Sequence, residues 1–326
     1  MMEKKIEMVH FQITRNCNLR CHFCGQWGKK GFFSDASGKN MTFDDWKNVV
    51  DQLDEYRKEN NTQIDITVWG GEPLVSPYFD EIVNYLHNRN YKIAIVTNGV
   101  LIDKHFDTIK SCVDKIYISI DGTKEIHDCI RGTGVFDRIV DNIKTLNHHN
   151  VTVMSVITEG LVNNLKEYMN LLNELNIKKL YLQDMIGLKS DEIVDYQNWI
   201  KNIFKIDAID INSWENNDVV DFGNEIDSIL NETDLTRLNY EIIHKTHLSN
   251  DEKTCLSSFR HIHIAWNGNV LYCTDFYDFV AGNVKEDKLI RIFTNRLSEK
   301  FREEISKNHC VTCKHCSWRN NVSFRI

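Results

Sequence analysis

Hydrophobic and polar positions follow two alternating periods along the first 190 residues of the chain. Short apolar segments, typical of buried strands, occur at residues 9–13, 64–69, 92–97, 115–120, 151–157 and 179–182. Each is followed by a stretch with apolar residues three and four positions apart, the spacing of one face of an amphipathic helix. This alternation predicts six βα units arranged around a parallel sheet.

The helical stretches carry apolar stripes that predict core packing. The first stripe consists of Phe43, Trp46, Val49, Val50, Leu53 and Tyr56. Thr42 precedes it and Asp45 follows three residues later, which predicts a capping box at the start of the helix. Similar stripes lie within residues 79–86, 139–146 and 165–175.

The pattern changes after residue 190. Residues 190–250 are rich in Asn, Asp, Trp and Ile, and a helix is expected at 224–238, but no chemistry can be assigned there. Residues 263–272 have the pattern of a β-hairpin that turns at Asn267 and Gly268. We therefore expect a core at 1–190, a bridging helical region at 191–250 and a cysteine-rich α+β domain at 251–326.

The charge balance and the lack of long apolar runs exclude several function classes. The chain has 39 basic and 47 acidic residues and a net charge of −8, without the basic footprint of a nucleic-acid-binding protein. No apolar run approaches the roughly 20 residues that span a membrane. The N-terminus lacks the apolar core of a signal peptide, so a cytoplasmic location is expected, with no nucleic acid or membrane partner.

Ten cysteines in a chain without an export signal favour metal or redox use over disulfides, because the cytosol keeps thiols reduced. Eight fall into two groups: Cys17, Cys21 and Cys24 near the N-terminus, and Cys255, Cys273, Cys310, Cys313 and Cys316 near the C-terminus. Cys112 and Cys129 stand apart, and free cysteines are usually buried. Core packing is therefore predicted for these two.

The N-terminal triplet lies on one short loop after the first predicted strand. Three thiolates can hold three irons of a [4Fe–4S] cluster and leave the fourth iron open, whereas electron-transfer clusters usually take four cysteines. A structural zinc site and three unrelated core cysteines are the alternatives. Zinc fits less well because it prefers four ligands, commonly supplied in CxxC pairs.

The spacing CxxxCxxC, with Phe23 before the last cysteine, resembles the signature of the radical S-adenosylmethionine (radical SAM) enzymes. The resemblance implies an α/β fold with a partial (β/α)6 TIM barrel. It also implies that the open iron chelates SAM, and that one electron cleaves SAM to a 5′-deoxyadenosyl radical. A reductase such as flavodoxin or ferredoxin would donate that electron. In such barrels the reactive groups lie at the C-terminal ends of strands.

Further residues at predicted strand ends match this resemblance. The run Gly70, Gly71, Glu72 and Pro73 resembles the family's GGEP motif, which binds the SAM amino group, and the two glycines let the backbone approach a ligand closely. Asn98 ends the third strand and has a weaker claim, since Asn-Gly is a common turn pair.

The fourth and later strands add candidates for the SAM ribose, carboxylate and adenine. Strand alternation places Ser119 and Asp121 on one face, where both side chains can reach ribose hydroxyls. Arg131 resembles a family arginine that pairs with a carboxylate, the alternative being an exposed loop arginine. Val153 and Val156 are candidates for adenine packing or for the barrel interior. Gln183 and Asp184 are candidates for facing the substrate.

The second cysteine group resembles the opening element of the SPASM and twitch extensions of radical SAM proteins. That element is Cys255, Gly268 and Cys273 at the family spacing. Two cysteine-ligated clusters would need about eight thiolates, and five are present. One auxiliary [4Fe–4S] cluster is therefore predicted, held by Cys255, Cys273 and two of Cys310, Cys313 and Cys316. Zinc is the alternative here.

These features together predict a radical SAM enzyme of the SPASM/twitch type acting on a peptide or carbohydrate-like small molecule. The single auxiliary cluster resembles the aminocyclitol dehydrogenase branch. An N-terminal peptide-recognition domain is not expected because the cluster motif begins at Cys17, which leaves a peptide delivered by a separate partner. The alternative from another class is a non-catalytic iron–sulfur or zinc protein for structure or electron transfer.

Overall fold

The computed structural model of the chain describes residues 3–27, 31, 39–232, 255, 257–273, 277–307 and 312–313, with backbone alone at 241–243. The predicted ligands Cys310 and Cys316, and the end of the helix predicted at 224–238, lie outside the described residues. Within the described residues, no helix combines the length and apolar character that crossing a bilayer demands.

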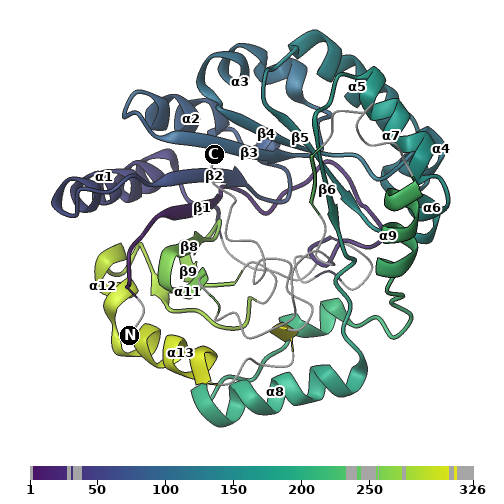
Figure 1. The fold of residues 1–326 in the computed structure, drawn as a ribbon. Coiled ribbons are helices and arrows are strands. Elements are labelled where there is room, and N and C mark those ends of the chain that lie inside the picture. The colour runs from purple at the N-terminus through teal and green to yellow at the C-terminus, as the bar shows by residue number, and fades with distance from the viewer. Residues whose placement is uncertain are drawn as a thin grey trace.

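One mainly parallel sheet curls through the molecule with helices on its outer side (Figure 1). Its strands are β1 (Met8–Gln12), β2 (Asp65–Trp69), β3 (Lys92–Thr97), β4 (Lys115–Ser119), β5 (Val151–Val156), β6 (Lys179–Gln183), β7 (Glu241–Ile243), β8 (His261–Ile264), β9 (Asn269–Leu271) and β10 (Gly282–Asn283). The strand order is β10-β9-β8-β1-β2-β3-β4-β5-β6-β7, and neighbours from β8 through β1 to β7 run parallel. The predicted α/β partial barrel is therefore confirmed.

The helices link successive strands and cover the outside of the sheet. They are α1 (Phe43–Glu59), α2 (Phe79–His87), α3 (Phe106–Cys112), α4 (Lys124–Arg131), α5 (Val135–Leu146), α6 (Glu159–Asn163), α7 (Leu165–Glu174), α8 (Ser190–Phe204), α9 (Gly223–Glu232), α11 (Ser257–Arg260), α12 (Leu289–Thr294) and α13 (Arg296–Lys307), with short 3-10 turns η1 (Pro73–Val75), η2 (Ile102–His105) and η3 (Asp210–Trp214). The capping box of Thr42 and Asp45 begins α1 as predicted.

Strand alternation sorts side chains between the outer core and the barrel interior. On β1, Phe11 points outward and its ring centroid lies 4.8 Å from that of Trp46 on α1. Val153 on β5 likewise belongs to the core under the helices. Val153 and Val156 lie an odd number of positions apart and face opposite sides of the strand, so only one of them can face the barrel interior, and contact of either with adenine stays a prediction.

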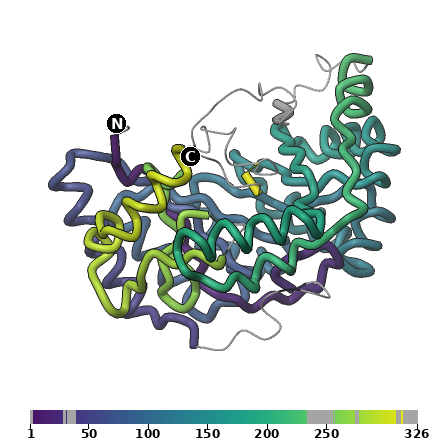
Figure 2. The backbone as a smooth tube through the Cα atoms, turned by 90° about the horizontal axis from the view of Figure 1, so that it is seen from below, coloured from purple at the N-terminus to yellow at the C-terminus, as the bar shows by residue number. Residues whose placement is uncertain are grey.

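The cysteine-rich end of the chain completes this sheet instead of forming a detached body. Strand β8 pairs in parallel with β1, joining Met8 to His261 and Phe11 to Ile264. Strands β8 and β9 form the predicted hairpin, in which Gly268 adopts a φ of +94°. Helices α12 and α13 lie beside the N-terminal segment (Figure 2), where Lys4 and Glu299 form an ion pair of 2.9 Å.

Two histidines meet across this joint. His10 on β1 and His263 on β8 are buried, and their rings stack with centroids 4.2 Å apart at 12°. Burial lowers the pKa of both well below the usual value, and repulsion from a neighbouring histidine is a further cause, from His263 and His261 for His10 and from His261 for His263. The pair is therefore neutral near pH 7, which lets the two rings stack without charge repulsion.

The two isolated cysteines have different surroundings. Cys112 is buried at the end of α3, as predicted, whereas Cys129 is exposed on α4. The core-packing prediction is wrong for Cys129 because it lies on the outer face of α4, whose buried residues are His127 and Ile130.

Candidate active site

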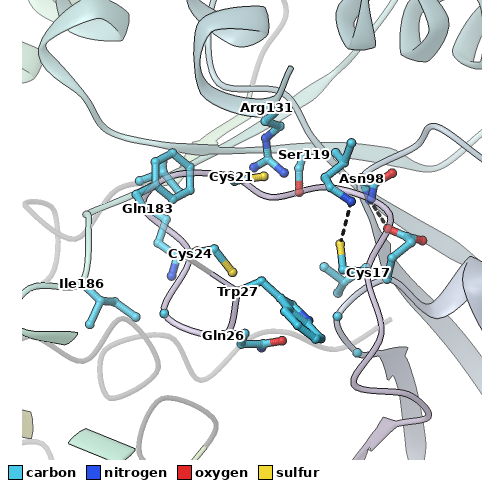
Figure 3. Close-up of a pocket in the computed structure, with 18 of the residues that line it drawn as sticks. Cys17, Cys21, Cys24, Gln26, Trp27, Asn98, Ser119, Arg131, Gln183 and Ile186 are labelled. Carbon is cyan, nitrogen blue, oxygen red and sulfur yellow. Dashed lines mark hydrogen bonds between the residues drawn. The ribbon is translucent and has the colours of Figure 1, made fainter. Parts of the chain in front are cut away.

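The predicted site residues gather around one cavity of about 230 Å³ at the C-terminal ends of the parallel strands (Figure 3). Those that line it are Cys17, Cys21, Cys24, Gly70, Gly71, Glu72, Asn98, Ser119 and Arg131. Val156, Gln183 and Asp184 also line it. Pro73 and Asp121 do not.

The loop after β1 turns its three cysteine side chains toward the cavity (Figure 3). The Cys24 N–H donates to the Cys21 carbonyl at 3.1 Å, and the Leu19 N–H donates to the Cys17 sulfur at 3.4 Å. The Arg20 guanidinium donates to the Cys17 carbonyl at 2.7 Å. These bonds, all between residues of the loop, hold it in shape.

A second loop, after β2, runs directly against the cysteine loop. The Gly71 N–H donates to the Thr14 carbonyl at 3.0 Å, and the Glu72 N–H donates to the Asn16 carbonyl at 2.8 Å. A Cβ on Gly71 would lie 2.5 Å from the Arg15 and Asn16 carbonyl oxygens. The glycines therefore make room for the backbone of the cysteine loop.

Glu72 joins the ends of β2 and β3. Its carboxylate accepts hydrogen bonds from the Leu74 N–H at 3.1 Å, the Thr97 hydroxyl at 2.7 Å and the Asn98 N–H at 2.7 Å. Burial raises the pKa of Glu72 to about 7, against the lowering effect of these bonds. The Asn98 amide also donates to the Asn18 side chain at 2.8 Å, which ties β3 to the cysteine loop.

Asp121 has a different place from the one that strand alternation predicts. Strand β4 ends at Ser119, so Asp121 lies past the regular strand. Its side chain is fully buried, pairs with the Arg131 Nε at 2.5 Å and accepts the Val156 N–H at 3.0 Å. Ser119 faces the cavity, whereas Asp121 holds Arg131 at its edge.

Burial disfavours the thiolate form of Cys17 and Cys21, whereas Arg131 keeps its positive charge. Burial opposes the charge of Arg131, but Asp121 and Cys21 outweigh burial and hold the Arg131 pKa above its usual range. Burial raises the pKa of Cys17 to about 12, and it raises the pKa of Cys21 against the lowering effect of Arg131. Without a metal the Cys17 and Cys21 thiols stay protonated, and metal binding would release those protons.

The structure also brings in side chains that sequence reasoning missed. Trp214, from the bridging region, packs on the cysteine loop: a Cβ on Gly25 would lie 2.6 Å from the Trp214 ring. Trp27 donates its indole N–H to the Arg15 carbonyl at 2.6 Å. Met185, just past β6, completes the wall. Trp27 follows the triplet closely, but nothing in the sequence pattern connects Trp214 to Gly25.

Three of the five auxiliary cysteines are described. Cys255, Cys273 and Cys313 are partly buried and pack against the main core. The Ser257 hydroxyl donates to the Tyr272 carbonyl at 3.0 Å, which holds the segments after Cys255 and before Cys273 together. This agrees with the hairpin expectation, and the ligand set of the auxiliary cluster stays a prediction.

The donor set fits a [4Fe–4S] cluster with an open iron. Three sulfurs face one cavity, and among the described residues that line it there is no fourth cysteine. An amide N–H already donates to one of the sulfurs, as is common around iron–sulfur clusters, where such bonds tune the potential. The remaining lining offers a buried carboxylate, amides, a hydroxyl and a guanidinium to a polar ligand.

Comparison with known proteins gives two family matches. The model of the radical SAM superfamily matches residues 11–175. The model of SPASM, an iron–sulfur cluster-binding domain, matches residues 255–317.

Individual relatives match to different extents. A cysteine-type anaerobic sulfatase-maturating enzyme from Clostridium novyi is 23% identical over 97% of this chain and 86% of its own length. Mycofactocin maturase MftC from Mycobacterium tuberculosis is 32% identical, but over only 49% of this chain and 40% of its own length.

Two solved structures share the fold. Streptococcus suis SuiB bound to S-adenosylmethionine superposes with a TM-score of 0.69 at 16% identity, covering 96% of this chain and 72% of SuiB. The anSMEcpe protein with bound AdoMet and Cp18Cys peptide gives 0.62 at 19% identity, covering 97% and 87% of the two chains.

Proposed function

The chain belongs to the radical SAM superfamily, and from this membership we propose that it takes a hydrogen atom from a C–H bond of a peptide. It is an enzyme whose cofactors are [4Fe–4S] clusters and SAM. When bound, these cofactors supply a 5′-deoxyadenosyl radical after one-electron reduction, with a flavodoxin or ferredoxin reductase as the proposed donor. The convergence of Cys17, Cys21 and Cys24 on one cavity carries the proposal.

The chain's own residues hold and orient the reacting partners. We assign the cluster to the three cysteines and the SAM amino group to the loop of Gly70, Gly71 and Glu72. The Glu72 carboxylate has about four acceptor positions and accepts three bonds within the protein, which leaves one for an ammonium group. Pro73 begins the η1 turn behind this loop.

The opposite wall is assigned to the rest of the cofactor. Ser119 and Asn98 offer a hydroxyl and an amide, Arg131 offers a guanidinium to a carboxylate, and Asp121 acts as a positioning residue for Arg131. Trp27 and Trp214 add apolar surface that excludes water, which favours a radical over side reactions.

A peptide substrate is favoured over a carbohydrate by the relatives. One of the curated proteins matched over nearly the whole chain is a sulfatase-maturating enzyme, and the anSMEcpe structure holds a peptide. In this proposal one auxiliary cluster accepts the electron left on the product radical or positions the peptide. Its ligands are Cys255, Cys273 and two of Cys310, Cys313 and Cys316. Family membership argues against the non-catalytic alternative.

The decisive experiment measures 5′-deoxyadenosine after anaerobic reconstitution with iron and sulfide, followed by SAM and dithionite. We expect product from the wild type and none from the Cys17→Ala variant. The exposed Cys129 lies outside the cavity, so Cys129→Ala is the matched control and keeps the product. An intact triplet cluster that yields no product would overturn the proposal.

Iron content tests the number of clusters independently. Two cubane clusters predict about eight irons per chain, falling to about four when Cys17, Cys21 and Cys24 are all replaced by alanine. Zinc in place of iron at the auxiliary cysteines, measured by elemental analysis of protein purified without oxygen, would contradict the auxiliary cluster alone.

A further inference from the structure

A second chamber adjoins the cavity that holds the cysteines. It also measures about 230 Å³, and the two spaces share Asp184 and Met185 just past β6. Sites for whole drug-sized ligands usually occupy about 300–1,000 Å³. The second chamber is therefore large enough for one side chain of a larger substrate. The reacting part of that substrate would lie in the neighbouring cavity that the cysteines line.

Hydrogen bonds and close packing within the protein hold the walls of the chamber in place. Leu188 donates its N–H to the Trp214 carbonyl and accepts the Asn216 N–H, both at 2.9 Å, which folds the bridging segment back across the strand end. The Asn217 side chain accepts the Ser190 N–H at 3.1 Å, which ties the segment to α8. Val219 then packs so closely on Gly187 that a Cβ there would lie 2.1 Å from it.

The lining combines negative charge with apolar surface. Among the described residues of the lining, Asp184, Glu192 and Asp221 carry three negative charges and Lys189 one positive charge, a balance of −2. Backbone N–H groups hold two of the carboxylates in place: Lys189 donates to Glu192 at 3.0 Å, and Gly223 donates to Asp221 at 2.9 Å.

The apolar part of the lining suits an aliphatic stem. Ile157, Val219 and Val220 contribute it, and Val220 is 60% exposed at the rim. A side chain with a flexible four-carbon stem and a terminal ammonium group, which is the structure of lysine, complements both the apolar surface and the carboxylates.

We propose that this chamber binds a lysine side chain of the peptide substrate and so places a neighbouring C–H bond beside the cysteine cavity. The inference rests on the proposed function. Asp184 has the central place in it, because it lines both spaces. The chamber thereby selects which residue of a peptide is presented for hydrogen abstraction.

Binding to the reconstituted, SAM-loaded full chain tests the proposal. The probes are acetyl-Gly-Lys-Gly-amide and its norleucine counterpart, titrated by calorimetry without oxygen. We expect the lysine peptide to bind about three- to tenfold more tightly at low ionic strength. The advantage should shrink in 0.5 M salt, because the rim of the chamber is open to solvent and its charges are screened.

Substitutions then locate the preference. Asp184→Asn and Glu192→Gln keep the shape of the side chain and an acceptor oxygen but remove its charge. Each should therefore reduce the advantage of the lysine peptide over the norleucine peptide. Asp184→Glu retains a carboxylate and should keep that advantage. Asp218→Asn is the matched control, because Asp218 is exposed in the same segment and does not line the chamber.

Each outcome has a distinct meaning. Equal affinity for the two peptides overturns the proposal, and so does a lysine preference that survives the double variant Asp184→Asn, Glu192→Gln. Binding of methyl 2-amino-2-deoxyglucoside as tight as that of the lysine peptide overturns the assignment to a peptide. Formation of 5′-deoxyadenosine by the wild type is measured separately, and its absence counts against the proposed function and leaves the binding result standing.

Discussion

Asp121 and Arg131 form an ion pair that is almost wholly shielded from water, with side-chain exposures of 0% and 10%. Removing one partner of a buried pair leaves the other charge uncompensated, which costs about 3–5 kcal/mol. We therefore expect Asp121→Asn to lower the free energy of unfolding by about that amount, measured by denaturant titration of the cluster-free protein.

The exposed pair of Lys124 and Asp137 provides the comparison. Its side chains are 49% and 58% exposed, and pairs of this kind contribute about 0–1 kcal/mol. Asp137→Asn should therefore change the free energy of unfolding by less than about 1 kcal/mol. Equal effects of the two substitutions would contradict the positioning role assigned to Asp121.

Gly71 tests the contact between the two loops. An alanine there would press on carbonyl oxygens at 2.5 Å, so Gly71→Ala should displace the cysteine loop and reduce the iron bound at the triplet. In α6 a Cβ on Gly160 would meet its nearest neighbour at 3.5 Å, an ordinary contact. Gly160→Ala should therefore keep the iron content, and a full complement in Gly71→Ala would contradict the account.

For single residues, the sequence predicts which side chains gather at the cavity but not always the role of each one there. The lining by Glu72, Ser119 and Arg131 follows from their positions at strand ends. The prediction for Asp121 assumed that β4 continues in regular alternation, whereas the strand ends two residues earlier. Where a strand ends depends on its tertiary neighbours, which local periodicity does not contain.

Among the elements, the short turn η3 connects the two ends of the chain to the site. Asp278, beyond β9, accepts the N–H groups of Ile209 and Asp210 at 2.8 and 3.0 Å, which fixes the start of η3. The turn ends at Trp214, which packs on Gly25. The auxiliary segment thereby helps to hold an aromatic ring over the cysteine loop.

Asp210, the first residue of the same turn, makes the stability of the fold depend on pH. Burial, and next the nearby Asp278, raise the pKa of Asp210 to about 6, above its value of about 3.9 in an unfolded chain. The folded state therefore binds the proton more tightly, and stability falls as pH rises from about 4 to 6. Asp210→Asn should raise the melting temperature by about 1–3 °C at pH 8 and change it little at pH 4.

Thermal unfolding at the two pH values measures this effect. Asp207→Asn is the control, because Asp207 is 77% exposed and paired with Lys201, so it should not raise the melting temperature at pH 8. A larger gain for Asp210→Asn at pH 4 than at pH 8 would contradict the sign of the shift.

Element by element, periodicity predicts both ends of each of the six barrel strands to within one residue, and Asn267 with Gly268 predicts the hairpin. The bridging region shows the limit. Trp214 reaches the site through the η3 turn and its contact with Gly25, and such a contact between distant parts of the chain leaves no local pattern in the sequence.

For the whole molecule, the pairing of β8 with β1 makes the auxiliary segment part of the barrel wall. A chain that ends at residue 250 would leave the β1 edge unpaired, and an exposed strand edge promotes aggregation. We expect such a chain to elute at the void volume in size-exclusion chromatography. The full-length Cys255→Ala, Cys273→Ala variant keeps β8 and should elute with the wild type.

A truncated chain that elutes as compact particles with an unchanged circular dichroism spectrum would show that β8 is dispensable. The sequence predicts a domain boundary near residue 250 because composition changes there. A strand that returns to the opposite edge of an earlier sheet is not visible in composition, since parallel pairing between remote segments has no local pattern.

The stacked rings of His10 and His263 give this shared wall an evolutionary consequence. A lineage that exchanges its C-terminal module for another also replaces His263, one of the two stacked rings. Strand β1 must then adapt at His10 to each new module. Recombination among relatives should therefore preserve both strands as a single inherited unit, and functional chimeras will be those whose crossover points carry the two histidines together.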